Sequence, residues 1–70
     1  MQIKPFDVVA ILEDHRAKGL VRGQVGAVVE TLAPNVFEVE FSDNHGRTYA
    51  SLALKGDELL VLHHEFVHAA

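Results

Sequence analysis

Two neighbouring segments constrain the fold of this 70-residue chain more than any others. Residues 19–26 contain three glycines, and the run from there to residue 32 includes the β-branched residues Val28, Val29 and Thr31. After a short break at residues 33–35, residues 37–41 alternate strictly between apolar and acidic side chains. Successive side chains of a strand point to opposite faces, so this alternation predicts a strand with one buried and one solvated face. The glycines predict positive φ angles or close backbone approach at bends.

Five short strands are predicted along the chain. They cover residues 7–13, 25–32, 37–41, 48–54 and 59–62. Polar turns are predicted at residues 33–35, with Asn35 in a left-handed conformation, and at residues 42–46. Residues 55–58 are predicted to form a single helical turn. Five short strands with glycine-rich bends indicate an all-β domain built as a small barrel.

The sequence of the first segment, residues 7–13, is compatible with either a helix or a strand. Val8, Ile11 and Leu12 have helical spacing, and Asp7 is suited to cap a helix. A cluster of β-branched residues after Pro5 favours a strand instead. Periodicity does not decide over so short a run, and we favour the strand because the segments that follow are strands.

Composition limits the kind of protein. The chain has no cysteine, which excludes disulfides and thiolate zinc sites and fits a reducing compartment. No apolar run approaches the roughly 20 residues that cross a bilayer, and we read no signal peptide. We therefore expect one cytoplasmic domain over residues 1–70 that does not act on a membrane, with its core at about 6–62 and a C-terminal tail at 63–70.

The charge balance argues against nucleic acid as a partner. The net charge is −4 with histidines neutral, and the six lysines and arginines are scattered along the chain. Arg16, Lys18 and Arg22 form the one local basic group that is close in sequence. Three charges give only weak, salt-sensitive phosphate binding. A solvated loop is the simpler interpretation of this group.

The tail contains a formal match to the zinc-protease pattern His-Glu-x-x-His, from His64 to His68. A catalytic zinc needs a third protein ligand, and only Ala69 and Ala70 follow in this sequence. We therefore predict no enzyme, no cofactor and no dedicated metal site. His64 and His68 remain the weak candidates for adventitious metal binding.

Glutamates form the one candidate binding surface. Glu38 and Glu40 share the polar face of their strand, and Glu30 is expected on an adjacent strand. This acidic stripe is either an ordinary wet sheet face or a docking surface for a basic partner. Four of the five aromatic residues are assigned to the core: Phe6, Phe37, Phe41 and Tyr49.

The ordered pattern resembles a family of small bacterial proteins, the domain of unknown function 4926. The resemblance rests on Asp-Val-Val-Ala-Ile-Leu-Glu-Asp (7–14), Gly-Leu-Val-Arg-Gly-Gln-Val-Gly-Ala-Val-Val-Glu (19–30), Phe-Glu-Val-Glu-Phe-Ser-Asp (37–43), Gly-Arg-Thr-Tyr-Ala (46–50) and residues 59–62. It implies a five-stranded SH3-like barrel, similar in shape to the nitrile hydratase β-subunit and to KOW domains. It also implies a strand in the first segment and a long loop through residues 13–23. It implies no activity, and it does not extend to the histidines of the tail.

The sequence thus predicts a non-catalytic interaction module that binds a protein partner or itself. Two alternatives stay open: an accessory or neutralising subunit of an adjacently encoded enzyme, and a weak RNA binder of the KOW type. A homodimer is expected to be accessible, by exchange of a strand or of the C-terminal tail, because 70 residues make a thin core.

Overall fold

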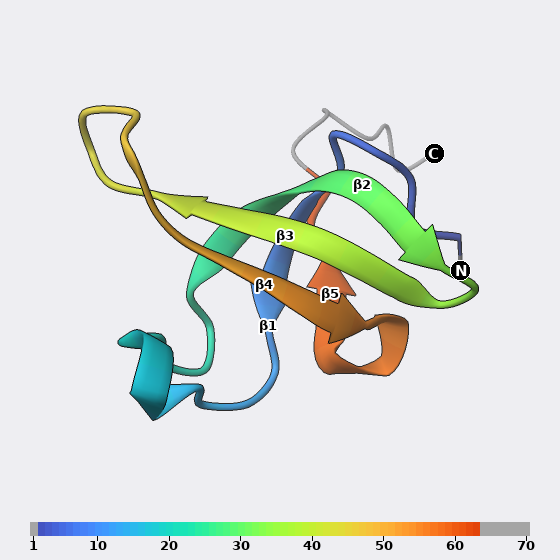
Figure 1. The fold of residues 1–70 in the computed structure, drawn as a ribbon, viewed down its shortest axis with the longest axis horizontal. Coiled ribbons are helices and arrows are strands. Elements are labelled where there is room, and N and C mark those ends of the chain that lie inside the picture. Colours follow the sequence, from blue (N-terminus) through green and yellow to red (C-terminus); the bar gives the residue numbers. More distant parts are fainter. Residues whose placement is uncertain (1, 64–70) are drawn as a thin grey trace, which may run out of the picture.

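Five strands form a single antiparallel sheet in the computed structural model, which describes residues 2–63 (Figure 1). The elements are β1 (Val8–Ile11), the 3-10 helix η1 (Arg16–Lys18), β2 (Val25–Ala33), β3 (Val36–Ser42), β4 (Thr48–Lys55), the 3-10 helix η2 (Gly56–Glu58) and β5 (Leu59–Val61). The strand order is β4-β3-β2-β1-β5. The predicted all-β class, with one short helical turn before the last strand, is confirmed, and the first segment is a strand.

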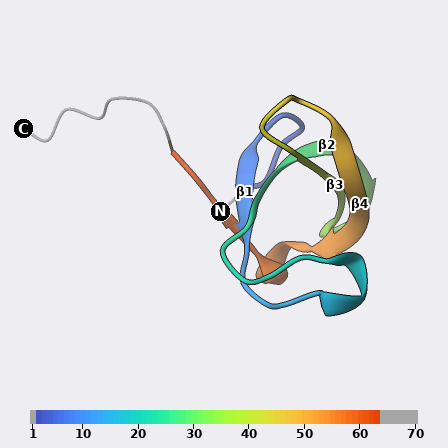
Figure 2. The ribbon, with the colours of Figure 1, turned by 90° about the vertical axis from the view of Figure 1, so that its left-hand side faces the viewer.

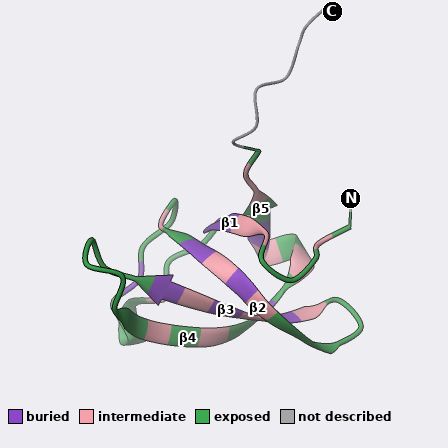
Figure 3. Ribbon diagram, turned by 90° about the horizontal axis from the view of Figure 1, so that it is seen from above, coloured by how far each residue is buried: buried purple, intermediate pink, exposed green. Residues whose placement is uncertain are grey.

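The sheet curves around one apolar core (Figure 2). Strand β3 shows how the sequence achieves this, because buried and partly exposed residues alternate along it (Figure 3). Phe37, Val39 and Phe41 point into the core, while Glu38 and Glu40 lie on the opposite face. The other four strands and one loop supply the rest of the buried cluster: Val9, Ile11, Leu20, Val28, Leu54 and Leu59.

Two glycines before and within β2 have different structural roles. Gly23 has φ = +90°, which an L side chain rarely adopts, and its N–H donates to the carbonyl of Ile11 at 2.7 Å. Gly26 instead lies where backbones approach closely. A Cβ there would lie 2.7 Å from the carbonyl oxygen of Glu40 and 2.8 Å from the Phe41 ring. Both predicted uses of glycine are therefore present, one at each position.

The loop between β1 and β2 closes one end of the core. Leu20 is fully buried in it, although the sequence places it in a polar loop. Asp14 holds the loop together: its carboxylate accepts the N–H of Arg22 at 2.7 Å and the guanidinium of Arg16 at 3.2 Å. Gln24 donates a side-chain hydrogen bond to the Tyr49 hydroxyl, which ties the end of this loop to β4.

The prediction that Phe6 and Tyr49 belong to the core is wrong. Phe6 is 85% exposed because it lies in a turn outside the sheet, where its N–H donates to the carbonyl of Val28 at 2.7 Å. Tyr49 is 47% exposed because it is in phase with the exposed residues Ser51 and Ala53 of β4, on the face opposite to buried Leu54. Phe37 and Phe41 alternate in phase with buried Val39 along β3 and are buried as predicted.

Candidate functional site

The structure brings the three predicted glutamates together on the face of the sheet that points away from the core. Glu30 of β2 is the direct cross-strand partner of Glu38 of β3, and Glu40 lies two residues further along β3. Thr48 donates its hydroxyl to Glu40 at 3.3 Å. Within residues 2–63, the ion pair that forms is Arg16–Asp14, so no described cation neutralises these three carboxylates. The face therefore carries an uncompensated negative stripe.

An apolar depression borders this stripe on the same face. Ala27 pairs with Val8 on one side and with Glu40 on the other. The side chains of Val8, Ala27 and Glu40 therefore lie in one row across three strands. The depression has a volume of about 240 Å³ and is lined by Val8, Val25, Gly26, Ala27, Glu40 and Ser42. Together, the three glutamates and this depression are called the outer face below. It offers apolar contact beside negative charge.

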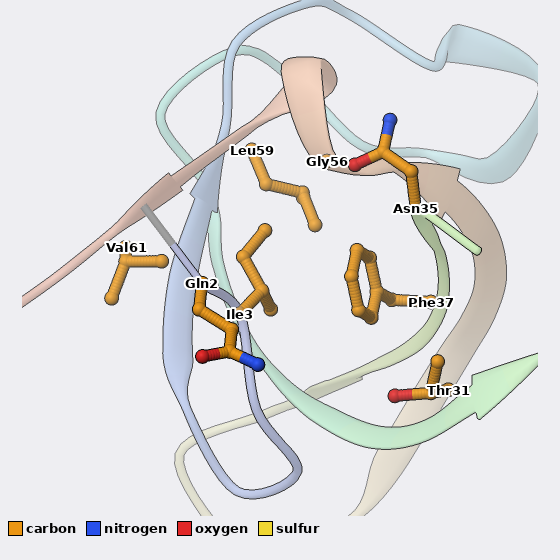
Figure 4. Close-up of a pocket in the computed structure, with 8 residues that line it drawn as sticks. All are labelled: Gln2, Ile3, Thr31, Asn35, Phe37, Gly56, Leu59 and Val61. Carbon is orange, nitrogen blue, oxygen red and sulfur yellow. The ribbon is translucent and has the colours of Figure 1, made fainter.

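A second and larger cavity, called the end cavity, opens at the end of the sheet near the N-terminal segment (Figure 4). Its volume is about 450 Å³. Core residues Phe37 and Leu59 project into it together with Ile3, while the Gln2 and Asn35 amides lie toward its rim. The lining is Gln2, Ile3, Thr31, Asn35, Phe37, Gly56, Leu59 and Val61, in which no side chain is charged. Such a lining suits a neutral, largely apolar group.

The sequence did not identify the end cavity. Its lining comes from the N-terminal segment, the β2–β3 hairpin, η2 and β5, which are far apart in the chain. Of the lining residues, the sequence marked only Asn35, because a turn at Pro34–Asn35 was predicted. Asn35 has φ = +60°, as expected, and its carbonyl accepts the N–H of Gly56 at 3.1 Å.

Histidine and carboxylate side chains are spread over the part of the chain that the structure describes. Among residues 2–63, no three histidine or carboxylate side chains are placed to hold a metal ion. His15 begins η1, and its buried Nε2 has no described hydrogen-bond partner. His45 lies in the β3–β4 turn, where its backbone N–H donates to Asp43 at 2.8 Å. His64 and His68 lie outside the described residues, so their metal candidacy stays a prediction.

The predicted basic group lies in the β1–β2 loop. Arg16, Lys18 and Arg22 are all exposed there. Asp14 forms an exposed ion pair with the guanidinium of Arg16, which offsets one of the three positive charges. No helix of residues 2–63 has both the length and the apolar character needed to cross a membrane.

Comparison with known proteins identifies the family. A family model described as a domain of unknown function (DUF4926) matches residues 6–61, which is most of the chain and includes all five strands. No curated protein and no solved structure matched. The chain belongs to the family of domain of unknown function 4926.

Proposed function

We propose that this domain is a non-catalytic protein-interaction module whose outer face binds a basic segment of a protein partner. One observation carries the proposal: Glu30 and Glu38 are directly opposite each other, with Glu40 beside them and no described cation in contact. Like charges directly opposite in a sheet destabilise it. A partner that brings lysine or arginine to this face would remove that repulsion.

The depression adds apolar contact to the charge. Val8, Val25 and Ala27 lie beside Glu40, so the best-matched segment has a basic residue next to an apolar one. Electrostatic attraction of this kind raises association rates and weakens with added salt. We therefore expect affinity for the partner to fall as ionic strength rises.

We also propose a more specific fold than the all-β class described above. The strand order and the helical turn before β5 support an SH3-like barrel of the nitrile hydratase β-subunit or KOW type. A fold by itself does not imply a function, so this assignment adds no activity. The bacterial origin and the cytoplasmic location expected from the sequence remain predictions.

A nuclear magnetic resonance titration tests where the face binds. The ¹⁵N-labelled chain is titrated with a short peptide of alternating lysine and leucine, and separately with the matched glutamate and leucine peptide. The basic peptide should shift amides of Ala27, Glu38 and Glu40, and the acidic peptide should not. Shifts spread evenly over the surface, or equal effects of both peptides, would contradict the proposal.

The two alternatives predict different outcomes. An accessory subunit of an adjacently encoded enzyme predicts that one stoichiometric protein is captured from the native host, and that Glu38→Gln/Glu40→Gln abolishes the capture. RNA binding of the KOW type predicts a gel shift at low salt that depends on Arg16, Lys18 and Arg22. The net charge of −4 disfavours the RNA alternative, because nucleic-acid binders usually present a basic face.

A further inference from the structure

Phe6 is the most exposed large apolar side chain among the described residues, and the fold holds it in that position. It lies in the turn from Lys4 to Asp7, in which the N–H of Asp7 donates to the carbonyl of Lys4 at 3.1 Å. The Asp7 carboxylate accepts the backbone N–H of Lys4 at 2.9 Å, which closes the turn a second time. Phe6 has φ = +74°. These hydrogen bonds hold the backbone of the turn, which presents the aromatic ring to solvent.

Both the residue type and its exposure are unfavourable for the isolated chain. Pro5 followed by a left-handed residue is the arrangement of a type II turn, which ordinarily has glycine or asparagine in the place of Phe6. A bulky residue at positive φ is a backbone outlier, and such outliers cluster where a protein contacts a ligand or partner. A pre-organised exposed aromatic side chain is also the typical anchor of a protein interface.

The end cavity is a fitting receptor for such an anchor. Its floor is the apolar surface of Phe37, Leu59 and Ile3, and its lining contains no charged side chain. Its volume of about 450 Å³ exceeds the roughly 150 Å³ that is enough to hold a benzene molecule. A phenyl ring therefore fits with room for its backbone to enter.

The anchor and the cavity lie at the same end of the molecule. Ile3 lines the cavity, and Phe6 follows it by three residues, which limits their separation to about 11 Å. Two copies related by a two-fold axis can then insert each Phe6 into the other's cavity, which gives a closed, self-complementary contact.

We propose that the domain forms a two-fold homodimer in which Phe6 of each copy occupies the end cavity of the other. This inference names a surface separate from the outer face, so it can fail while the proposed binding of a basic partner stands. No residue belongs both to the lining of the end cavity and to the outer face. The dimer would therefore present two acidic stripes to its partner.

Sedimentation velocity of the full chain at 1–200 µM, a range chosen to span roughly micromolar dissociation constants, tests the dimer. The wild type should show concentration-dependent dimers. Phe6→Asn should raise the dissociation constant at least about tenfold, because asparagine suits the turn but supplies no apolar anchor. Urea unfolding measured below the dimer dissociation constant should show that this variant is no less stable than the wild-type monomer. If Phe6 had only a structural role, Phe6→Asn would lower the free energy of unfolding of the monomer.

Two further variants complete the test. Thr31→Arg places a charge in the cavity lining and should weaken the dimer as Phe6→Asn does, whereas Val21→Ser removes an exposed apolar side chain elsewhere and should change nothing. Nuclear Overhauser contacts between the Phe6 ring of one copy and Leu59 methyl groups of a differently labelled copy should appear in the wild type. A wild type that is monomeric at every concentration, or a dimer unaffected by Phe6→Asn, would overturn the proposal.

Discussion

Gly26→Ala should destabilise the domain through a single added methyl group. The Cβ would lie 2.7 Å from the Glu40 carbonyl oxygen and 2.8 and 2.9 Å from two carbons of the Phe41 ring. Real Cβ atoms do not approach this closely, so β2 and β3 must separate or the ring must move. Phe41 is fully buried and the carbonyl belongs to the backbone, so neither can swing aside freely.

The expected magnitude follows from two opposing terms. Overpacking of a well-filled core costs about 1–3 kcal/mol, and contacts with a backbone atom and a buried ring place this case in the upper part of that range. Replacing glycine by alanine also restricts the unfolded chain, which returns about 0.4–1 kcal/mol. The free energy of unfolding should therefore fall by about 1–2.5 kcal/mol. A domain of this size has roughly 3.5–10 kcal/mol in all, so the loss is large.

Urea denaturation followed by far-ultraviolet circular dichroism measures this difference. Thermal unfolding should show a Tm lowered by roughly 5–20 °C. Gly23 provides the matched control, because nothing lies within 4 Å of its added Cβ and only its φ of +90° opposes a side chain. Asparagine tolerates that region, so Gly23→Asn should be milder than Gly26→Asn. If Gly26→Ala were as stable as the wild type within about 0.5 kcal/mol, about half the smallest net loss expected, the close-approach argument would be refuted.

Three other substitutions test separate parts of the structure. Leu20→Ala should lower the free energy of unfolding by about 2–5 kcal/mol in urea denaturation, because it empties a fully buried site, and a loss under about 1 kcal/mol would contradict that burial. Glu38→Lys should stabilise the domain by about 0.2–1 kcal/mol at low salt, since it places an opposite charge across from Glu30, and the gain should shrink at high salt. Asp14→Ala should speed amide hydrogen exchange at Arg22, whose N–H loses its acceptor, and unchanged exchange would argue against this anchor.

The elements governed by local periodicity were predictable from the sequence. The alternation of residues 37–41 gave both the strand and its buried face, because one residue step changes the face of a strand. Gly23 and Asn35 were also predictable, since positive φ is restricted to a few residue types. Glu30 was expected on a strand adjacent to Glu38 and Glu40; the structure adds that Glu30 is the direct cross-strand partner of Glu38.

Features that depend on contacts between distant segments were not predictable. Leu20 lies in a loop with polar and basic neighbours, and only the closing of the loop over the core buries it. Phe6 is a large apolar residue of the type usually found in a core, but the hydrogen bonds of its turn hold it outside. The end cavity combines four separated segments, so no local pattern marks it.

The central claim is that the outer glutamates serve binding of a basic partner, and isothermal titration of one variant pair tests it most directly. The dissociation constant of the lysine–leucine peptide is measured for the wild type, for Glu38→Gln/Glu40→Gln and for the control Glu13→Gln/Asp57→Asn, which removes the same charge elsewhere. We predict that the outer-face variant weakens binding at least about tenfold, as expected when an interface anchor is lost, while the control stays within about twofold. Equal dissociation constants for the two variants would contradict the account, because net charge rather than this face would then determine binding.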